Sequence, residues 1–225
     1  MSNAMSAIDK FTSQVKRKCE QLGLDVVGFA DPANYKKYEN YPKRNRPERF
    51  LSTVKTVIVV GIHLEDVILD TWFQSSEKSC QFADMIIENK CYKLKDYLTD
   101  KGYKTALISY SPGLFLKDSA ALAGIGPIGK HNLLITEQFG SQVRLRALVT
   151  EAPLICGDPI TASEFCKDCT LCEEACPVDA LKGGEYHRMK CESYQLNHLR
   201  KVSDNASIWC NRCIEACPIG SENMI

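Results

Sequence analysis

The chain has 225 residues, which suits one large domain or one domain joined to a small module. Its 28 basic and 28 acidic residues give a formal net charge of zero, so no overall field favours nucleic acid or an anionic membrane. No basic and apolar signal region opens the chain, and the longest apolar stretch, residues 57–62, is too short to cross a bilayer. We therefore expect a reducing cytoplasm, where cysteine thiolates can bind metal. Residues 1–4, in front of Met5, resemble an expression-tag remnant and carry no fold information.

The first predicted element is an amphipathic helix, because apolar residues recur every three or four positions. These residues are Ile8, Phe11, Val15, Cys19 and Leu22. Gly23 follows as a helix-ending residue, and residues 24–30 then predict a short buried strand. Residues 31–53 contain three prolines and are predicted to be irregular.

The irregular stretch is locally basic between residues 36 and 49, with tyrosines interleaved among its lysines and arginines. This composition would suit contact with an anionic ligand or a nucleic acid. Glu39 and Glu48 dilute the charge, however, and no nucleic-acid-binding motif accompanies it. A solvated loop is therefore the favoured interpretation.

Strands and helices alternate through the middle of the chain. Residues 56–63 form a continuous β-branched run, which predicts a central strand covered on both faces. Residues 143–150 alternate apolar and polar side chains, which predicts a half-buried strand. The other predicted elements are a helix over 79–100, a strand over 104–110, a short helix over 116–123, strand-like residues 133–136 and a linker over 153–159.

A glycine-rich stretch follows the short helix and reads Gly124-Ile-Gly126-Pro-Ile-Gly129-Lys130-His131. It matches G-x-G-x-x-G, but the predicted order of helix, glycines and strand is the reverse of a dinucleotide site. It also nearly matches the Walker pattern, except that His131 replaces the magnesium-binding hydroxyl. Two interpretations stay open: a tight turn that needs the conformational freedom of glycine, or a backbone that passes close to a flat cofactor.

Eight cysteines in the last sixty residues fall into two linked groups. The first group is Cys166, Cys169, Cys172 and Cys176, and the second is Cys191, Cys210, Cys213 and Cys217. The first group and Pro177 form the run C-x2-C-x2-C-x3-C-P, which two-cluster bacterial ferredoxins use to bind [4Fe–4S] clusters. The second group repeats the x2, x3, proline ending, and Cys191 supplies its missing early cysteine.

In such a run three closely spaced thiolates bind one cluster, and the cysteine before proline binds the other. We therefore predict two clusters with exchanged fourth ligands. Cluster A takes Cys166, Cys169, Cys172 and Cys217, and cluster B takes Cys176, Cys191, Cys210 and Cys213. Structural zinc and disulfides are the alternatives, although zinc sites typically show simple C-x-x-C pairs and need only four ligands. Cys19, Cys80, Cys91 and Cys156 are not expected to be ligands.

The sequence resembles the iron–sulfur reductase family of epoxyqueuosine reductase, which is related to the corrinoid reductive dehalogenases. The resemblance begins at Asp118-Ser119-Ala120 and includes residues 123–130, 132–136, 139–140 and 143–145, followed by both cysteine groups in order. It extends over most of the chain, from about residue 22 to residue 218.

This resemblance implies an α/β (α+β) fold. A nitroreductase-like sheet-and-helix domain over residues 1–155 would be joined to a bacterial-type 2[4Fe–4S] ferredoxin module over 156–225. It implies cobalamin near the first cluster, with FMN as the alternative, against Gly124, Gly126, Ile128, Gly129, Lys130 and His131. Electrons from a redox partner protein would pass through the clusters to the cobalt. Asp118 matches the family's proposed proton donor; its alternative role is a helix N-cap.

Departures from the family set the expected substrate. This chain has Pro127 where many relatives carry an aromatic residue, and Ala121 where proline is common. It also stops at Ile225, eight residues after Cys217, where epoxyqueuosine reductases commonly continue into a tRNA-binding extension. We therefore expect an iron–sulfur reductase acting on a small molecule, with neither nucleic acid nor membrane as a partner. A ferredoxin-like carrier and a cluster-based sensor are the alternatives.

Overall fold

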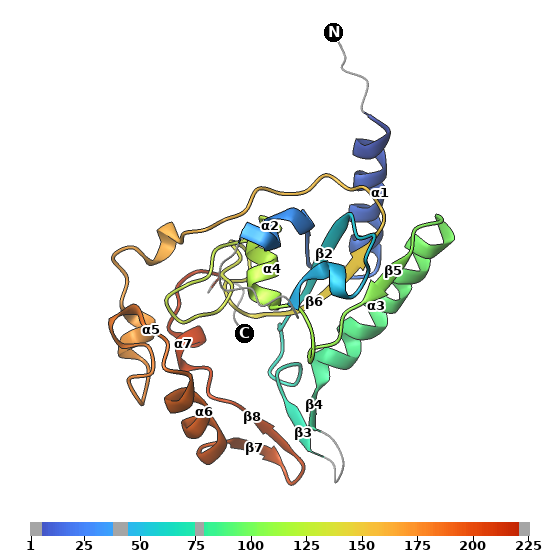
Figure 1. Cartoon of the computed structure of the whole chain (residues 1–225). Helices are drawn as coiled ribbons and strands as arrows, with labels where there is room; N and C mark the ends of the chain where they lie inside the picture. Colours follow the sequence, from blue (N-terminus) through green and yellow to red (C-terminus); the bar gives the residue numbers. More distant parts are fainter. Residues whose placement is uncertain (1–5, 38–44, 75–78, 221–225) are drawn as a thin grey trace. The chain divides into compact units, whose positions relative to one another are not determined.

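The structure is a computed structural model that describes residues 6–37, 45–74 and 79–220 (Figure 1). The tag remnant and part of the basic stretch at 36–49 lie outside these residues. The chain divides into two compact units, each built from several segments. Unit 1 comprises Met1–Ile62, Ile87–Ile125 and Leu145–Thr161, and unit 2 comprises His63–Ile86, Gly126–Arg144 and Ala162–Ile225. Two earlier segments thus group with the cysteine-rich part, and a domain boundary at 155/156 stays a prediction.

A four-stranded sheet organises unit 1 in the order β1-β2-β6-β5. Its strands are β1 (Val26–Ala30), β2 (Thr56–His63), β6 (Val143–Thr150) and β5 (Thr105–Leu107). The outer strands β1 and β5 run antiparallel to their neighbours. Both central strands have the predicted bounds, and β2 is buried as expected. β6 is buried throughout from Leu145 rather than half-buried, because it lies between β2 and β5.

The polar residues of β6 are accommodated by specific partners. Arg146 is 5% exposed in its side chain, and its Nη2 lies 3.1 Å from Glu88 Oε2. The guanidinium also lies over the ring of Tyr110, 3.8 Å from the ring centroid. Arg146 is thus a buried residue held by an ion pair with the partly exposed Glu88 and by a cation–π contact, not part of a solvated face.

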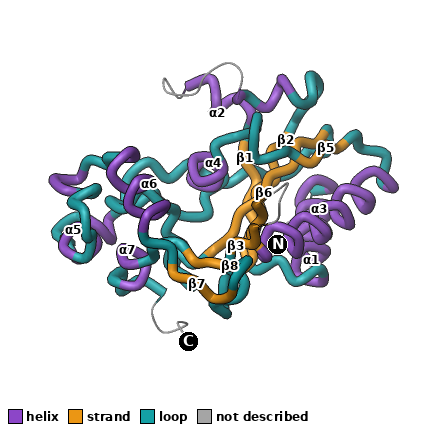
Figure 2. Tube along the Cα trace, turned by 90° about the horizontal axis from the view of Figure 1, so that it is seen from below, coloured by secondary structure: helices purple, strands orange, loops and turns teal. Residues whose placement is uncertain are grey.

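Helices cover both faces of this sheet, with α1 (Ala7–Gln21) and α3 (Phe82–Asp100) on one side and α4 (Leu116–Leu122) on the other (Figure 2). A capping box between Ser6 and Asp9 begins α1. Gly23, at φ +67°, follows its end as predicted. The helix expected from residue 79 begins at Phe82, because Ser79–Gln81 forms strand β4.

Part of the stretch expected to be irregular is folded. It contains α2 (Pro32–Lys37) and the 3-10 helix η2 (Pro47–Arg49). Pro32 occupies the first helical position, where the missing N–H is tolerated, and the Asp31 side chain accepts a hydrogen bond from the Ala33 N–H. Tyr35 is fully buried. The segment thus contributes a core residue, while Lys36 and Arg49 are exposed, so the solvated-loop interpretation of the basic stretch stays a prediction.

Unit 2 contains a second antiparallel sheet that the sequence analysis missed. Its order is β4-β3-β8-β7, with β3 at Trp72–Gln74, β4 at Ser79–Gln81, β7 at Arg200–Ser203 and β8 at Ala206–Ile208 (Figure 1). Trp72 stacks on Trp209 with ring centroids 4.9 Å apart. Residues 133–136 form no named strand, only the isolated bridges Ile128–Leu134 and Thr136–Gly140.

Short helices carry the cysteine-rich part of unit 2. These are η3 (Glu164–Cys166), α5 (Leu171–Glu174), η4 (Lys182–Gly184), α6 (Arg188–Asn197) and α7 (Arg212–Glu215). Cys172 lies in α5 and Cys213 lies in α7. Each half of the cysteine pattern therefore has one thiol on a single α-helical turn. Within the described residues, every helix is too short or too polar to cross a membrane.

Candidate iron–sulfur site

The four cysteines assigned to cluster A converge on one cavity in unit 2. Cys166, Cys169, Cys172 and Cys217 all line it. The remaining lining residues are Lys130, His131, Ile135, Phe165, Leu171, Pro218 and Ile219. The pKa values of Cys172 and Cys217 are both raised, mainly by burial and further by the nearby Cys166 and Cys169. The structure thus brings together residues that lie 51 positions apart (217 minus 166).

The four cysteines assigned to cluster B form a second group. Burial raises the pKa of Cys213 to about 12, and Cys210 and Cys191 raise it further. The pKa of Cys191 is raised by burial and by Cys176 and Cys210, while a hydrogen bond from Tyr186 lowers it. Cys172 of the first group also raises the pKa of Cys213. The two cysteine groups therefore lie close enough to interact electrostatically.

Within the described part of the chain, no group of three or more His, Cys, Asp or Glu side chains is placed to hold one ion. A structural zinc needs four ligands at about 2.0–2.3 Å from one centre. The cysteines of a [4Fe–4S] cluster bind different irons and are therefore held farther apart.

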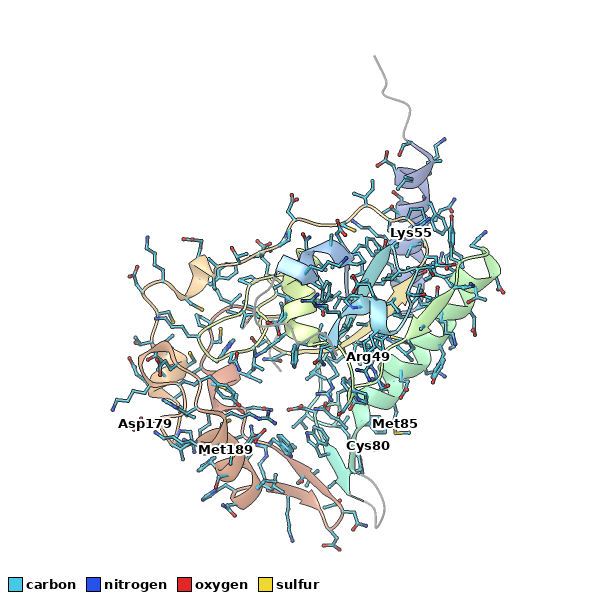
Figure 3. All side chains as sticks on the ribbon, viewed as in Figure 1. Arg49, Lys55, Cys80, Met85, Asp179 and Met189 are labelled. Atoms are coloured by element: carbon cyan, nitrogen blue, oxygen red, sulfur yellow. The ribbon has the colours of Figure 1, made fainter. Side chains whose placement is uncertain are left out.

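Polar contacts support the cysteine loops. The Ala180 N–H donates to Cys176 Sγ at 3.2 Å. Asp179, which Figure 3 labels near α5, has φ 50° and turns the chain just before this contact. Lys130 Nζ donates to the Cys169 carbonyl at 2.8 Å and lies 3.8 Å from Glu173 Oε1. Hydrogen bonds to sulfur and nearby charges are the means by which a protein tunes cluster potentials.

Residues of the 63–86 segment also support the second group, and the sequence analysis missed them. Asn211, which lies between Cys210 and Cys213, donates through Nδ2 to Asp70 Oδ2. Gln81 donates to Asp70 Oδ1. Burial raises the pKa of Asp70, while the bond from Asn211, the charge of Arg144 and the bond from Gln81 lower it.

The glycine stretch packs against its own chain. A Cβ on Gly126 would lie 2.0 Å from the Ile135 carbonyl oxygen, and one on Gly129 would lie 2.6 Å from Ile135 Cδ1. Gly124 has φ +72°, and a Cβ there would lie 2.9 Å from the Asp158 carbonyl oxygen. These contacts explain the glycines as elements of a tight turn, and close approach to a cofactor stays a prediction.

His131 is held inside this turn. It is 4% exposed, and its Nδ1 accepts a hydrogen bond from the Leu133 N–H at 3.2 Å. Its Nε2 therefore carries the proton and donates to Ser141 Oγ at 3.0 Å. Ser141 in turn donates to the Leu134 carbonyl at 2.6 Å. Both ring nitrogens are thus used to fix the turn.

Asp118 lies in the first turn of α4 in unit 1, but it is not the N-cap. Phe115 occupies the N-cap position, so the capping alternative is wrong. Asp118 is the third helical residue, where a carboxylate still interacts favourably with the helix dipole. Burial raises its pKa, while Lys117 and its own backbone lower it. A raised pKa is a property expected of a carboxylic acid that delivers protons.

Comparison with known proteins identifies an iron–sulfur-binding region in this chain of mixed α/β fold. The family model of the 4Fe-4S binding domain (Fer4) matches residues 160–182, which contain Cys166, Cys169, Cys172 and Cys176. This match shows a ferredoxin-like region and supports at least one cluster.

The particular relatives are epoxyqueuosine reductases, which confirms the predicted resemblance. The enzyme of Bacillus anthracis is 26% identical over 234 residues, covering 88% of this chain and 61% of the relative. That of Cyclobacterium marinum is 26% identical over 255 residues, covering 95% and 80%. That of Listeria monocytogenes is 36% identical over 107 residues, covering 44% and 28%. The chain thus spans about three fifths of the Bacillus anthracis relative.

Solved structures show the same fold. An epoxyqueuosine reductase bound to a modified tRNA-Tyr stem loop has a TM-score of 0.75 at 20% identity, covering 97% of this chain and 67% of its own. The epoxyqueuosine reductase of Streptococcus thermophilus has a TM-score of 0.71 at 19% identity, covering 93% and 66%. A reductive dehalogenase associated with B12-dependent dehalogenation has a TM-score of 0.70 at 19% identity, covering 100% and 34%.

Proposed function

We propose that this protein is a reductase that passes electrons through two [4Fe–4S] clusters, A and B, to a cofactor or substrate in a nitroreductase-like α/β domain. The observation that carries the proposal is the grouping of the cysteines. Proximity within unit 2 supports the two sets predicted from spacing: the cluster A cysteines line one cavity, and Cys176, Cys191 and Cys210 each raise the pKa of Cys213.

The clusters would form a relay. Cys172 of the cluster A group raises the pKa of Cys213 in the cluster B group, so the two groups are neighbours. Electrons would therefore move directly between the two centres. In the family's arrangement the cobalamin lies near the first cluster, which makes cluster B the entry point. Lys130, beside the cluster A cysteines, would favour arrival of an electron because its positive charge stabilises the reduced cluster.

Cobalamin is the proposed second cofactor, with FMN as the alternative, and it would supply the two-electron chemistry that one-electron clusters lack. The fit of the glycine stretch is partial. Gly126, Gly129 and His131 are engaged by the chain itself. Contacts would therefore come from the half-buried side chains of Ile128 and Lys130.

Asp118 is the proposed proton donor, because its carboxyl has a raised pKa and matches the family's Asp-Ser-Ala motif. We keep a small molecule as the expected substrate and a reducing cytoplasm as the expected compartment. The zero net charge supports the first, since binding to phosphate backbones rests on clustered basic residues.

Anaerobic purification with iron, sulfide and cofactor analysis tests the proposal. About eight irons and matching acid-labile sulfide are expected for two [4Fe–4S] clusters. Cys169→Ser is expected to remove cluster A signals, and Cys213→Ser those of cluster B. Stoichiometric zinc without acid-labile sulfide would contradict the proposal.

Titration with cob(II)alamin and with FMN then tests the second cofactor. Saturable binding that Ile128→Glu abolishes is expected for cobalamin. Gly126→Val is unsuitable for this test, because its Cβ would strike the Ile135 carbonyl. Binding of neither compound would favour a ferredoxin-like carrier, an alternative that the self-packed glycine stretch supports. Conversion of epoxyqueuosine in tRNA would overturn the small-molecule expectation.

A further inference from the structure

A second cavity of unit 2, of about 360 Å³, lies against the second cysteine group. Cys210, a proposed ligand of cluster B, is one of its lining residues. The others are Val67, Tyr194, His198, Arg200, Ile208, Trp209, Asn211, Arg212 and Glu215. Three separate parts of the sequence therefore meet at a cysteine that is expected to bind iron.

The lining combines an apolar base with positive charge. Ile208 is buried and Trp209 is half-buried beside it, with Val67 exposed at 53%. Arg200, on the fully exposed strand β7, and Arg212, at the start of α7, supply two positive charges against the single carboxylate of Glu215. We call this surface the cluster B face.

The aromatic part of the cluster B face is ordered by the chain itself. The rings of Tyr194 and His198 stack with centroids 4.1 Å apart. His198 Nδ1 also lies 3.0 Å from the Tyr194 carbonyl oxygen. Trp209 is stacked on Trp72. Rigid aromatic groups surrounded by arginines are the composition expected at the centre of a protein interface.

We propose that the cluster B face is the docking surface for an acidic electron-carrier protein. This inference rests on the proposed function, because it requires cluster B to be the entry point for electrons. An occupant of the cavity would touch the chain at Cys210, and electron tunnelling weakens steeply with distance. Redox partners form small, transient interfaces, and complementary charge raises their rate of encounter. The two arginines select an acidic partner.

Each encounter transfers one electron. The reduced carrier loses one electron and cluster B gains one, without formation of a bond or transfer of a proton. An RNA would also be attracted by arginines. Binding of an RNA would not require a cavity lined by a cluster ligand, whereas electron transfer from a carrier would. The carrier is therefore favoured, and RNA binding is one outcome of the test.

The test measures anaerobic reduction of the reconstituted full-length protein by pre-reduced flavodoxin, followed by stopped-flow absorbance at low and high salt. Arg200→Glu, on the exposed strand, is expected to lower the second-order rate at low salt by about tenfold, within the range of electrostatic steering, and to flatten its salt dependence. Arg212→Gln serves as the second, milder variant. Arg17→Glu, on the exposed surface of α1 in unit 1, is the matched control and should change neither quantity.

Reduction by dithionite distinguishes a failure of the proposed function from a failure of the docking inference. If dithionite fails to reduce the wild-type centres, the proposed function fails. If dithionite reduces every variant alike while flavodoxin reduces Arg200→Glu as fast as wild type, only the docking inference fails. Binding of oxidised flavodoxin, followed by NMR line broadening, gives a readout without turnover and should weaken in Arg200→Glu. Arg200-dependent binding of a short RNA stem, with unchanged flavodoxin kinetics, would also overturn the inference.

Discussion

Asp70 accepts a hydrogen bond from the side chain of Asn211, which lies between two proposed cluster ligands, Cys210 and Cys213. The two residues are 141 positions apart in sequence. Gln81 also donates to Asp70, so this carboxylate connects the β3–β4 hairpin region to the loop that carries the cysteines. The geometry of that loop therefore depends on a residue far outside the cysteine motif.

Asp70→Asn is expected to weaken cluster B while leaving cluster A intact. The Asp70 carboxylate accepts from both Asn211 and Gln81, but an amide in its place would turn an N–H donor toward one of them. A buried polar group left without a matching partner costs about 1–3 kcal/mol. Iron analysis after mild chelation, combined with paramagnetic resonance of each cluster, measures the effect. Glu65→Gln, in an exposed position of the same segment, is the control. Equal retention of iron in both variants would contradict the assigned role.

Removal of the four remaining cysteines should leave the iron content unchanged. Cys19, Cys91 and Cys156 belong to unit 1, whereas both cysteine groups belong to unit 2. Cys80 lies on β4 (Figure 3). Alanine at each position in turn, followed by iron determination, checks this. Loss of about half the iron in any one variant would show that the ligand assignment is wrong.

Lys130→Gln should lower the midpoint potential of cluster A. Removing one positive charge several ångströms away changes the electrostatic energy by about 1–2 kcal/mol at an effective dielectric constant near 20, and partial exposure reduces this. A decrease of about 30–60 mV is therefore expected in a redox titration monitored by paramagnetic resonance. Lys10→Gln, on α1 in unit 1, should leave the potential unchanged. A potential that does not move would place Lys130 in a purely structural role.

The pH dependence of turnover should report Asp118. Its pKa is raised, so the protonated form that would donate a proton is complete below that pKa and is lost as the pH rises through it. The descending limb of the rate profile should therefore lie above the usual aspartate range, and Asp118→Asn should abolish it along with most activity. Asp96→Asn, on the exposed face of α3, is the control. An unchanged profile in Asp118→Asn would exclude this residue as the donor.

The first sheet was predictable because its signals are local. The β-branched run of β2 and the helical period of α1 each specify an element without reference to the rest of the chain. Cysteine spacing likewise predicts two sets of cluster ligands, since ligands of one cluster are constrained by their loop lengths; that assignment stays a prediction.

The second sheet was not predictable by these means. β3, β4 and β8 have only three residues each, too few to show an alternating pattern, and β3 gains its partner from the other end of the chain. The burial of Tyr35 was hidden by neighbouring prolines and lysines, which are typical of loops. The role of Asp70 depends on a contact between distant segments, which no local pattern contains.

The pairing of β3 with β8 has a consequence for biosynthesis. Phe73 pairs with Ala206, so the hairpin is made 133 residues (206 minus 73) before the strand that completes its sheet. Until then the β3 edge is unpaired, and exposed strand edges promote association between chains. Contacts over such separations also form slowly. We therefore expect nascent chains to be most prone to association after β4 is made and before β8 is complete.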